Sequence, residues 1–135
     1  MKRNNMKETA KHLVGKVIPA NPDGFSIHQE SLRNVKFNRN SYFVSIFGHE
    51  LKVPLKGAYE RVYIWLKQSN ALLQDKKYFI GGWYDTDTDE FVLDINSIVN
   101  GYGKAISYAR MQRQKCIYHP HSGKTFNVET KAEAA

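Results

Sequence analysis

The chain has 135 residues, of which 41% are hydrophobic and 13% aromatic, enough apolar material for one packed domain. Twenty Lys and Arg against thirteen Asp and Glu give a formal net charge of +7, which favours an anionic partner, either nucleic acid or an acidic protein surface. The single cysteine excludes an internal disulfide and fits a reducing compartment, so we expect a cytoplasmic protein.

The first twelve residues, MKRNNMKETAKH, are highly charged and lack the apolar segment of a signal peptide. No apolar stretch elsewhere approaches the ~20 residues that cross a bilayer. A short helical turn over 7–13 is one option, after which Val14, Val17 and Ile18 predict a strand. We therefore expect a flexible basic N-terminus (1–12), a single domain (13–128) and a flexible tail (129–135).

The first half of the domain shows strand patterns between polar segments. A Pro- and Gly-containing turn over 19–24 precedes a short alternating strand over 25–28. The polar segment 30–40 predicts a loop, or a short strand at 35–37. SYFVSIF, over 41–47, predicts a core strand. The returning strand over 51–55 belongs at a sheet edge, because its proline cannot donate to a strand ladder.

A helix is predicted over 58–73. One face carries Ala58, Val62, Trp65, Leu66, Ser69, Leu72 and Leu73, so the helix should cover a sheet. The aromatic residues of this helix are Tyr59, Tyr63 and Trp65. We expect them to pack in the core, and a base-stacking platform is the alternative.

The remaining third predicts a compact ββαβ unit. YFIGGWY forms a strand in which Gly81 and Gly82 indicate a bulge or a close backbone approach. An acidic hairpin turn leads to a strand over 91–95, and a helix over 104–114 buries Ala105, Ile106 and Ala109. A strand over 115–118 follows. The fold class is α+β, with a mixed or mainly antiparallel sheet of five to seven short strands and two helices packed on one face.

No catalytic, metal or cofactor motif is complete. Asp85, Asp87 and Asp89 have calcium-loop spacing, but Glu90 and Asn96 stand where the loop needs Gly and its closing Glu, so we expect a polar turn. Cys116, His119 and His121 lie too close in sequence for a zinc set, and we expect Cys116 to be an inert buried thiol. The sequence therefore predicts a protein without enzymatic activity, catalytic residues, metal or cofactor, and an enzyme whose site no motif identifies is the third and lowest hypothesis.

Basic residues alternate with aromatic residues, a pattern typical of single-strand binding but also of ordinary core–solvent alternation. The aromatic members are Phe37, Tyr42, Tyr108 and Tyr118. Gly101-Tyr102-Gly103-Lys104 opens the second helix and could present N–H groups to an anion. The predicted binding residues for a partner or nucleic acid are Arg33, Lys36, Arg39, Lys104, Arg110 and Arg113.

The ordered set GFSI (24–27), YFIGGW (78–83), FVLDIN (91–96) and AISYARMQRQKCIYH (105–119) resembles a pattern in small phage and mobile-element proteins. In that group a GF(S/T) stretch, an IGGW strand, an LD(V/I)S strand and a helix ending in Q-x-A-I-(Y/W/F) follow one another. The chain departs from it at Asn96 and at Lys115-Cys116. The resemblance implies a genetic context, and no catalytic residue is carried over.

That context leads to the first functional hypothesis, an inhibitor of a host defence system, with an anti-CRISPR protein as its sharpest form. Such an inhibitor would bind and occlude a host defence protein or ribonucleoprotein complex in the host cytoplasm. The alternative is a nucleic-acid-binding accessory protein that contacts RNA or DNA directly. We expect no membrane partner, and either a monomer or a homodimer.

Overall fold

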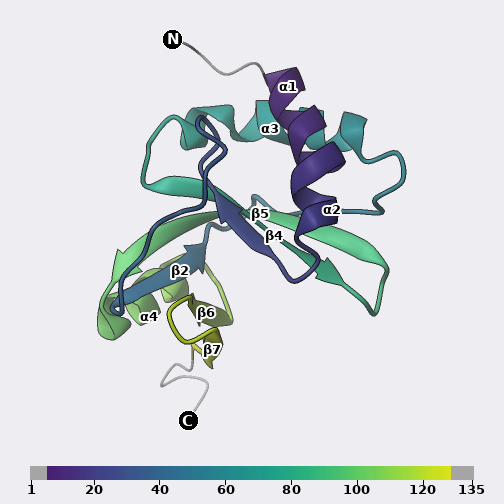
Figure 1. Ribbon diagram of the computed structural model, residues 1–135. Helices are drawn as coiled ribbons and strands as arrows, with labels where there is room; N and C mark the ends of the chain where they lie inside the picture. Colours follow the sequence, from purple (N-terminus) through teal and green to yellow (C-terminus); the bar gives the residue numbers. More distant parts are fainter. Residues whose placement is uncertain (1–5, 129–135) are drawn as a thin grey trace. The chain divides into compact units, whose positions relative to one another are not determined.

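The computed structural model describes residues 6–128, which form an α+β fold with one seven-stranded antiparallel sheet (Figure 1). The strand order is β1-β4-β5-β2-β6-β7, and β3 pairs with β5 outside this path. The elements, in chain order, are α1 (Met6–His12), η1 (Leu13–Val17), α2 (Ile18–Ala20), β1 (Phe25–Ile27), β2 (Ser41–Ser45), β3 (Leu51–Val53), α3 (Tyr59–Leu73), β4 (Tyr78–Asp85), β5 (Glu90–Asn100), α4 (Tyr102–Met111), β6 (Cys116–His119) and β7 (Lys124–Asn127).

The chain divides into two compact units. Among the described residues, the larger unit comprises 6–35 and 49–95, and the smaller unit comprises 36–48 and 96–128. The division falls within β5, whose residues up to Ile95 belong to the larger unit and whose residues from Asn96 belong to the smaller one. Each unit is described by itself below.

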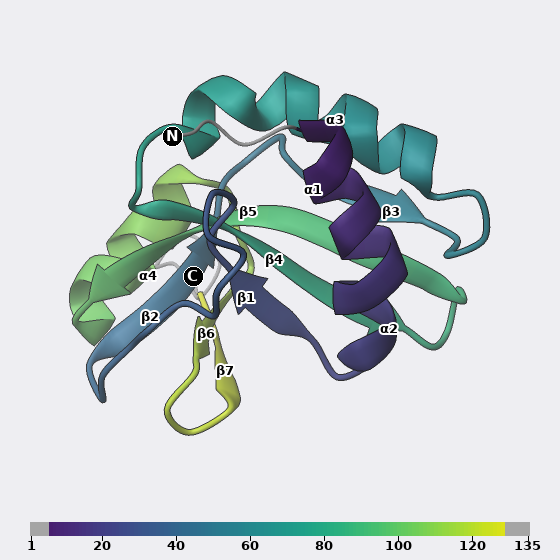
Figure 2. The ribbon, with the colours of Figure 1, turned by 45° about the horizontal axis from the view of Figure 1, so that its top comes forward.

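The larger unit begins with a continuous helical run, α1–η1–α2, and α1 packs beside α3 (Figure 2). Thr9, Ala10, Leu13 and Val17 are buried at a helical spacing. The strand predicted from Val14, Val17 and Ile18 is therefore wrong, and residues 6–12 are a packed helix rather than a flexible arm. The predicted tail, 129–135, lies outside the described residues.

The predicted amphipathic helix is confirmed as α3. Its buried face is the predicted one, with Val62 and Leu66 fully buried. Trp65 is 5% exposed, and its indole N–H donates to the carbonyl of His49 at 3.1 Å. Tyr59 and Tyr63 are half-buried and stack in parallel with their centroids 6.3 Å apart. Trp65 therefore belongs to the core and takes no part in an exposed platform.

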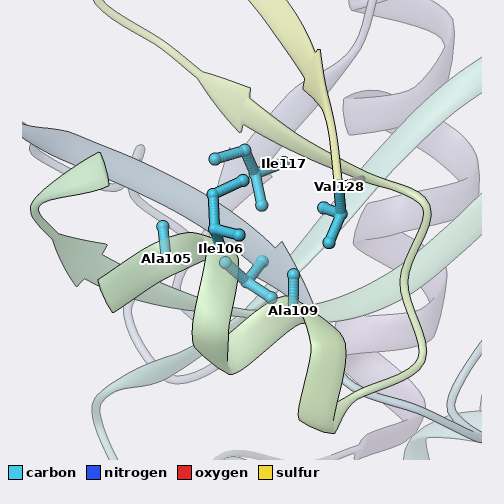
Figure 3. Packing of buried hydrophobic residues seen from close by; sticks show 6 residues of the cluster. Ala105, Ile106, Ala109, Ile117 and Val128 are labelled. Carbon is cyan, nitrogen blue, oxygen red and sulfur yellow. The ribbon is translucent and has the colours of Figure 1, made fainter. Parts of the chain in front are cut away.

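The smaller unit is built from α4 on strands β2, β6 and β7 together with the end of β5. In β2, Ser41 to Ser45 pair antiparallel with β5, and Phe43 pairs with Tyr118 of β6. Figure 3 shows the side chains of Ile106 and Ile117 pointing toward one another between α4 and the strands. The core of this unit consists of Val44, Ala105, Ile106, Ala109, Ile117 and Val128.

The predicted fold class and the C-terminal ββαβ order are confirmed, with every strand pairing antiparallel. Two differences concern element lengths. The N-terminal helical run adds a helix to the two predicted ones. The strand β5 continues to Asn100, five residues beyond its predicted end, because residues 96–100 pair with β2.

Candidate nucleic-acid interface

The positive charge of the protein is concentrated in the smaller unit. Residues 36–48 and 96–128 contain seven Lys and Arg and no Asp or Glu, whereas residues 6–35 and 49–95 contain ten Lys and Arg and eleven Asp and Glu. These two ranges therefore carry a formal charge of +7, and the ranges of the larger unit carry a formal charge of −1. The seven basic residues are all exposed: Lys36, Arg39, Lys104, Arg110, Arg113, Lys115 and Lys124.

Five of the six predicted binding residues lie in this unit, namely Lys36, Arg39, Lys104, Arg110 and Arg113. The sixth, Arg33, is exposed but belongs to the larger unit, where its backbone carbonyl accepts from His28 at 2.9 Å. The prediction omitted Lys115 and Lys124. The signal that could have found them is the lack of any acidic residue between Asn96 and Val128, which the sequence shows directly.

The loop that carries Lys36 and Arg39 is tied to the β6–β7 hairpin by His119. The Nε2 atom of His119 lies 2.7 Å from the carbonyl oxygen of Arg39, and Nδ1 lies 2.7 Å from the Ser122 hydroxyl. Because a carbonyl only accepts, Nε2 carries a proton, and in the neutral ring Nδ1 accepts from Ser122. The ring also packs on Tyr42, with centroids 4.8 Å apart. His119 therefore acts as a structural clamp.

The C-terminal end of α4 holds the loop after β2 in place. The backbone N–H of Phe47 donates to the Gln112 side chain at 2.9 Å, and the Arg113 guanidinium lies 4.9 Å from the centre of the Phe47 ring. Arg113 has a φ of 58°, a left-handed conformation that is uncommon for a residue with a side chain. Arg113 follows the C-cap Gln112 of α4, and its N–H donates to the carbonyl of Arg110 at 3.1 Å, as at an ordinary left-handed helix end.

The N-terminal end of α4 is the segment predicted to bind an anion. Gly101 adopts a φ of 105°, which favours glycine, and its N–H donates to the carbonyl of Asn40 at 2.8 Å. Tyr102 and Lys104 are exposed in the first turn of the helix. The geometry brings a helix N-terminus and a lysine together, and anion binding there stays a prediction.

Four exposed aromatic side chains accompany the cations. Two of them, Phe37 and Tyr118, belong to the predicted interleaved pattern, and Phe47 and Tyr102 do not. The other predicted aromatics, Tyr42 and Tyr108, are half-buried and pack against the core of the smaller unit. The sequence pattern therefore identified the region but not which rings reach its surface.

The other candidate sites considered from the sequence do not form a metal or catalytic site among the described residues. Within residues 6–128, no three His, Cys, Asp or Glu side chains come together as a metal set. The acidic hairpin turn is held by its own contacts, with the Asp87 N–H donating to the Asp85 carboxylate at 3.0 Å. Cys116 is exposed, so the prediction of a buried thiol is wrong, because alternation along β6 turns Ile117 into the core instead.

Comparisons with known proteins identify no relative. No family model matches the chain, and neither the curated proteins nor the solved structures include a significant match. In the part of the chain that the structure describes, no helix is long and apolar enough to cross a membrane.

Proposed function

We propose that the protein binds nucleic acid through the smaller unit. The observation that supports this proposal is the segregation of charge: seven exposed Lys and Arg and no acidic residue in residues 36–48 and 96–128. Phosphate contacts by Lys and Arg release counterions from the nucleic acid, and this release dominates sequence-independent affinity. The nearly neutral larger unit contributes no comparable field.

Four of the seven cations come from three segments that the fold fixes relative to each other within the unit. Lys36 and Arg39 lie on the loop clamped by His119, Lys124 starts β7 opposite His119, and Lys104 lies on α4. Because these segments are tied by hydrogen bonds and by a shared core, the surface is preorganised, and binding orders little additional backbone.

The test is a salt titration of binding to fluorescent oligonucleotides followed by anisotropy. We expect binding that weakens steeply with salt, with a log–log slope of up to about −5 if all seven cations contact a single strand. The triple variant Lys36→Ala, Arg39→Ala, Lys104→Ala should bind more weakly and with a slope smaller in magnitude by about 2.

The matched control removes the same charge from the larger unit. Lys16, Lys52 and Lys56 are exposed there, and replacing all three with Ala should leave both the affinity and the slope nearly unchanged at physiological salt. Equal losses in the two triple variants would show that net charge alone drives binding. Absence of binding to any oligonucleotide at low salt would contradict the proposal.

The inhibitor hypothesis stays a prediction, as do the phage or mobile-element context and the host cytoplasm as its compartment. A basic surface of this kind would meet the RNA of a ribonucleoprotein defence complex, which makes the two hypotheses compatible. Binding to a purified CRISPR effector loaded with its guide RNA distinguishes the two hypotheses. Tight binding and loss of target cleavage, in the absence of affinity for bare oligonucleotides, would favour inhibition over nucleic-acid binding.

A further inference from the structure

We propose that the smaller unit prefers single-stranded over duplex nucleic acid, because its exposed aromatic rings stack on unpaired bases. This inference rests on the proposed function and specifies its ligand: an unpaired strand, of DNA or of RNA, whose phosphates meet the cations and whose bases meet the rings.

The distribution of exposed rings supports the inference. Four of the five exposed aromatic side chains in residues 6–128 lie in the smaller unit, although it is the shorter of the two. They share that unit with all seven exposed cations and with no carboxylate. Aromatic rings beside Lys and Arg are the combination with which single-strand binding proteins hold bases and phosphates at once. The exposed fractions are 46% for Phe37, 56% for Phe47, 50% for Tyr102 and 39% for Tyr118.

Phe47 is the ring best prepared for stacking. Its backbone is fixed by Gln112 and its ring lies against the Arg113 guanidinium, yet more than half of the side chain remains exposed. A ring held in one orientation loses little side-chain entropy when a base packs on it. The left-handed backbone of Arg113 belongs to the end of α4, where its N–H donates to the carbonyl of Arg110 at 3.1 Å. Arg113 could also contact the phosphate next to a stacked base.

The other exposed rings are supported from below by packed aromatic residues. Phe37 and Tyr118 each lie 6.1 Å from the ring of Phe43, which is only 6% exposed. Tyr102 meets Tyr42 edge-on, with centroids 5.9 Å apart. Rings backed in this way keep their positions and offer their outer surface to a ligand.

The chemistry favours a single strand over a duplex. Charge alone would favour the duplex, because duplex DNA carries one negative charge per ~1.7 Å of helix axis. Bases inside a duplex are already stacked on each other, so exposed protein rings gain nothing from them without unstacking. Each base stacked on an aromatic ring tightens binding about five- to 150-fold, enough to reverse the electrostatic preference. We therefore expect the protein to prefer a single strand, and we expect this preference to depend on the exposed aromatic rings.

The test measures Kd for poly-dT and poly-U strands of about 12 nucleotides, a length within the range such proteins cover, and for a duplex of equal length. At about 0.15 M salt we expect the single strands to bind more tightly than the duplex. Phe47→Leu should weaken single-strand binding about ten-fold and leave duplex binding unchanged, while Phe47→Trp should retain it. Phe37→Leu, as a second variant, should also weaken single-strand binding and leave duplex binding unchanged.

The control is Trp83→Leu, which removes the one exposed aromatic side chain that the structure describes in the larger unit and should change neither affinity. Circular dichroism verifies that each variant is folded. If the duplex binds more tightly and the Phe variants bind single strands like the original protein, the stacking proposal is overturned while the proposed function stands. If no oligonucleotide binds, both are overturned.

Discussion

Gly82 shows how one missing side chain shapes the sheet of the larger unit. A Cβ atom at this position would lie 2.5 Å from Cζ of the Phe25 ring and 3.0 Å from Cδ2 of Leu93. Phe25 crosses directly over Gly82 in the β1–β4 pair and stacks on Phe91, with centroids 5.9 Å apart. The sequence predicted a bulge or a close backbone approach at Gly81-Gly82; the close neighbour of Gly82 is a side-chain ring, and the register of the β1–β4 pair is regular.

We expect Gly82→Ala to destabilise the protein by about 1–3 kcal/mol, because the added methyl group must displace a ring packed between strands. The matched control is Gly103→Ala in α4, where an added Cβ meets nothing within 4 Å. That variant should be neutral or more stable by up to about 1 kcal/mol, since Ala favours a helix over Gly. Urea denaturation measures both, and equal effects would contradict the packing argument.

The exposed thiol of Cys116 should be reactive in the folded protein. The thiol lies 3.5 Å from Oδ1 of Asn127, a weak contact that does not shield it. We expect a thiol reagent such as dithionitrobenzoate to modify about one equivalent in the folded protein, without denaturant. Cys116→Ser should abolish the signal. Reaction only after unfolding would instead support the buried thiol that the sequence predicted.

At the scale of elements, α4 and β6 depend on each other for burial. Ile117 is 1% exposed and forms part of the core that α4 covers (Figure 3). We expect Ile117→Ala to cost about 2–5 kcal/mol through lost burial and a residual cavity. Ile64→Ala, on the exposed side of α3 with 49% exposure, should change stability by less than about 0.5 kcal/mol. Denaturation followed by circular dichroism compares the pair, and similar costs would refute the assignment of this core.

The N-terminal helical run illustrates why local composition misleads. Val14, Val17 and Ile18 are β-branched and so predict a strand. The buried positions Thr9, Ala10, Leu13 and Val17 instead follow a helical period, and packing of α1 on α3 decides the outcome. Tertiary burial outweighs a propensity difference of well under 1 kcal/mol per residue.

At the scale of the whole molecule, the two units differ in charge although the chain passes from one to the other three times. The segment 49–95 carries eight acidic residues and separates residues 36–48 from residues 96–128, and neither of these ranges contains an acidic residue. Folding joins 36–48 to 96–128 through the β2–β5 pairing and thereby collects seven cations in one unit. The proposed nucleic-acid surface is a product of this topology, and the charge-matched triple variants test it at this scale.

Hydrophobic period and composition are local properties, so they were enough to predict the α+β class, the helix α3 with its buried face, the ββαβ order and the excess of positive charge. The sequence also located five of the cations that share one unit. Folding places Arg33 in the other unit, brings Phe47 and Tyr102 to the surface and turns Cys116 outward. These features depend on which distant strands pair and which side of each strand is covered, and both are fixed by contacts far apart in the chain.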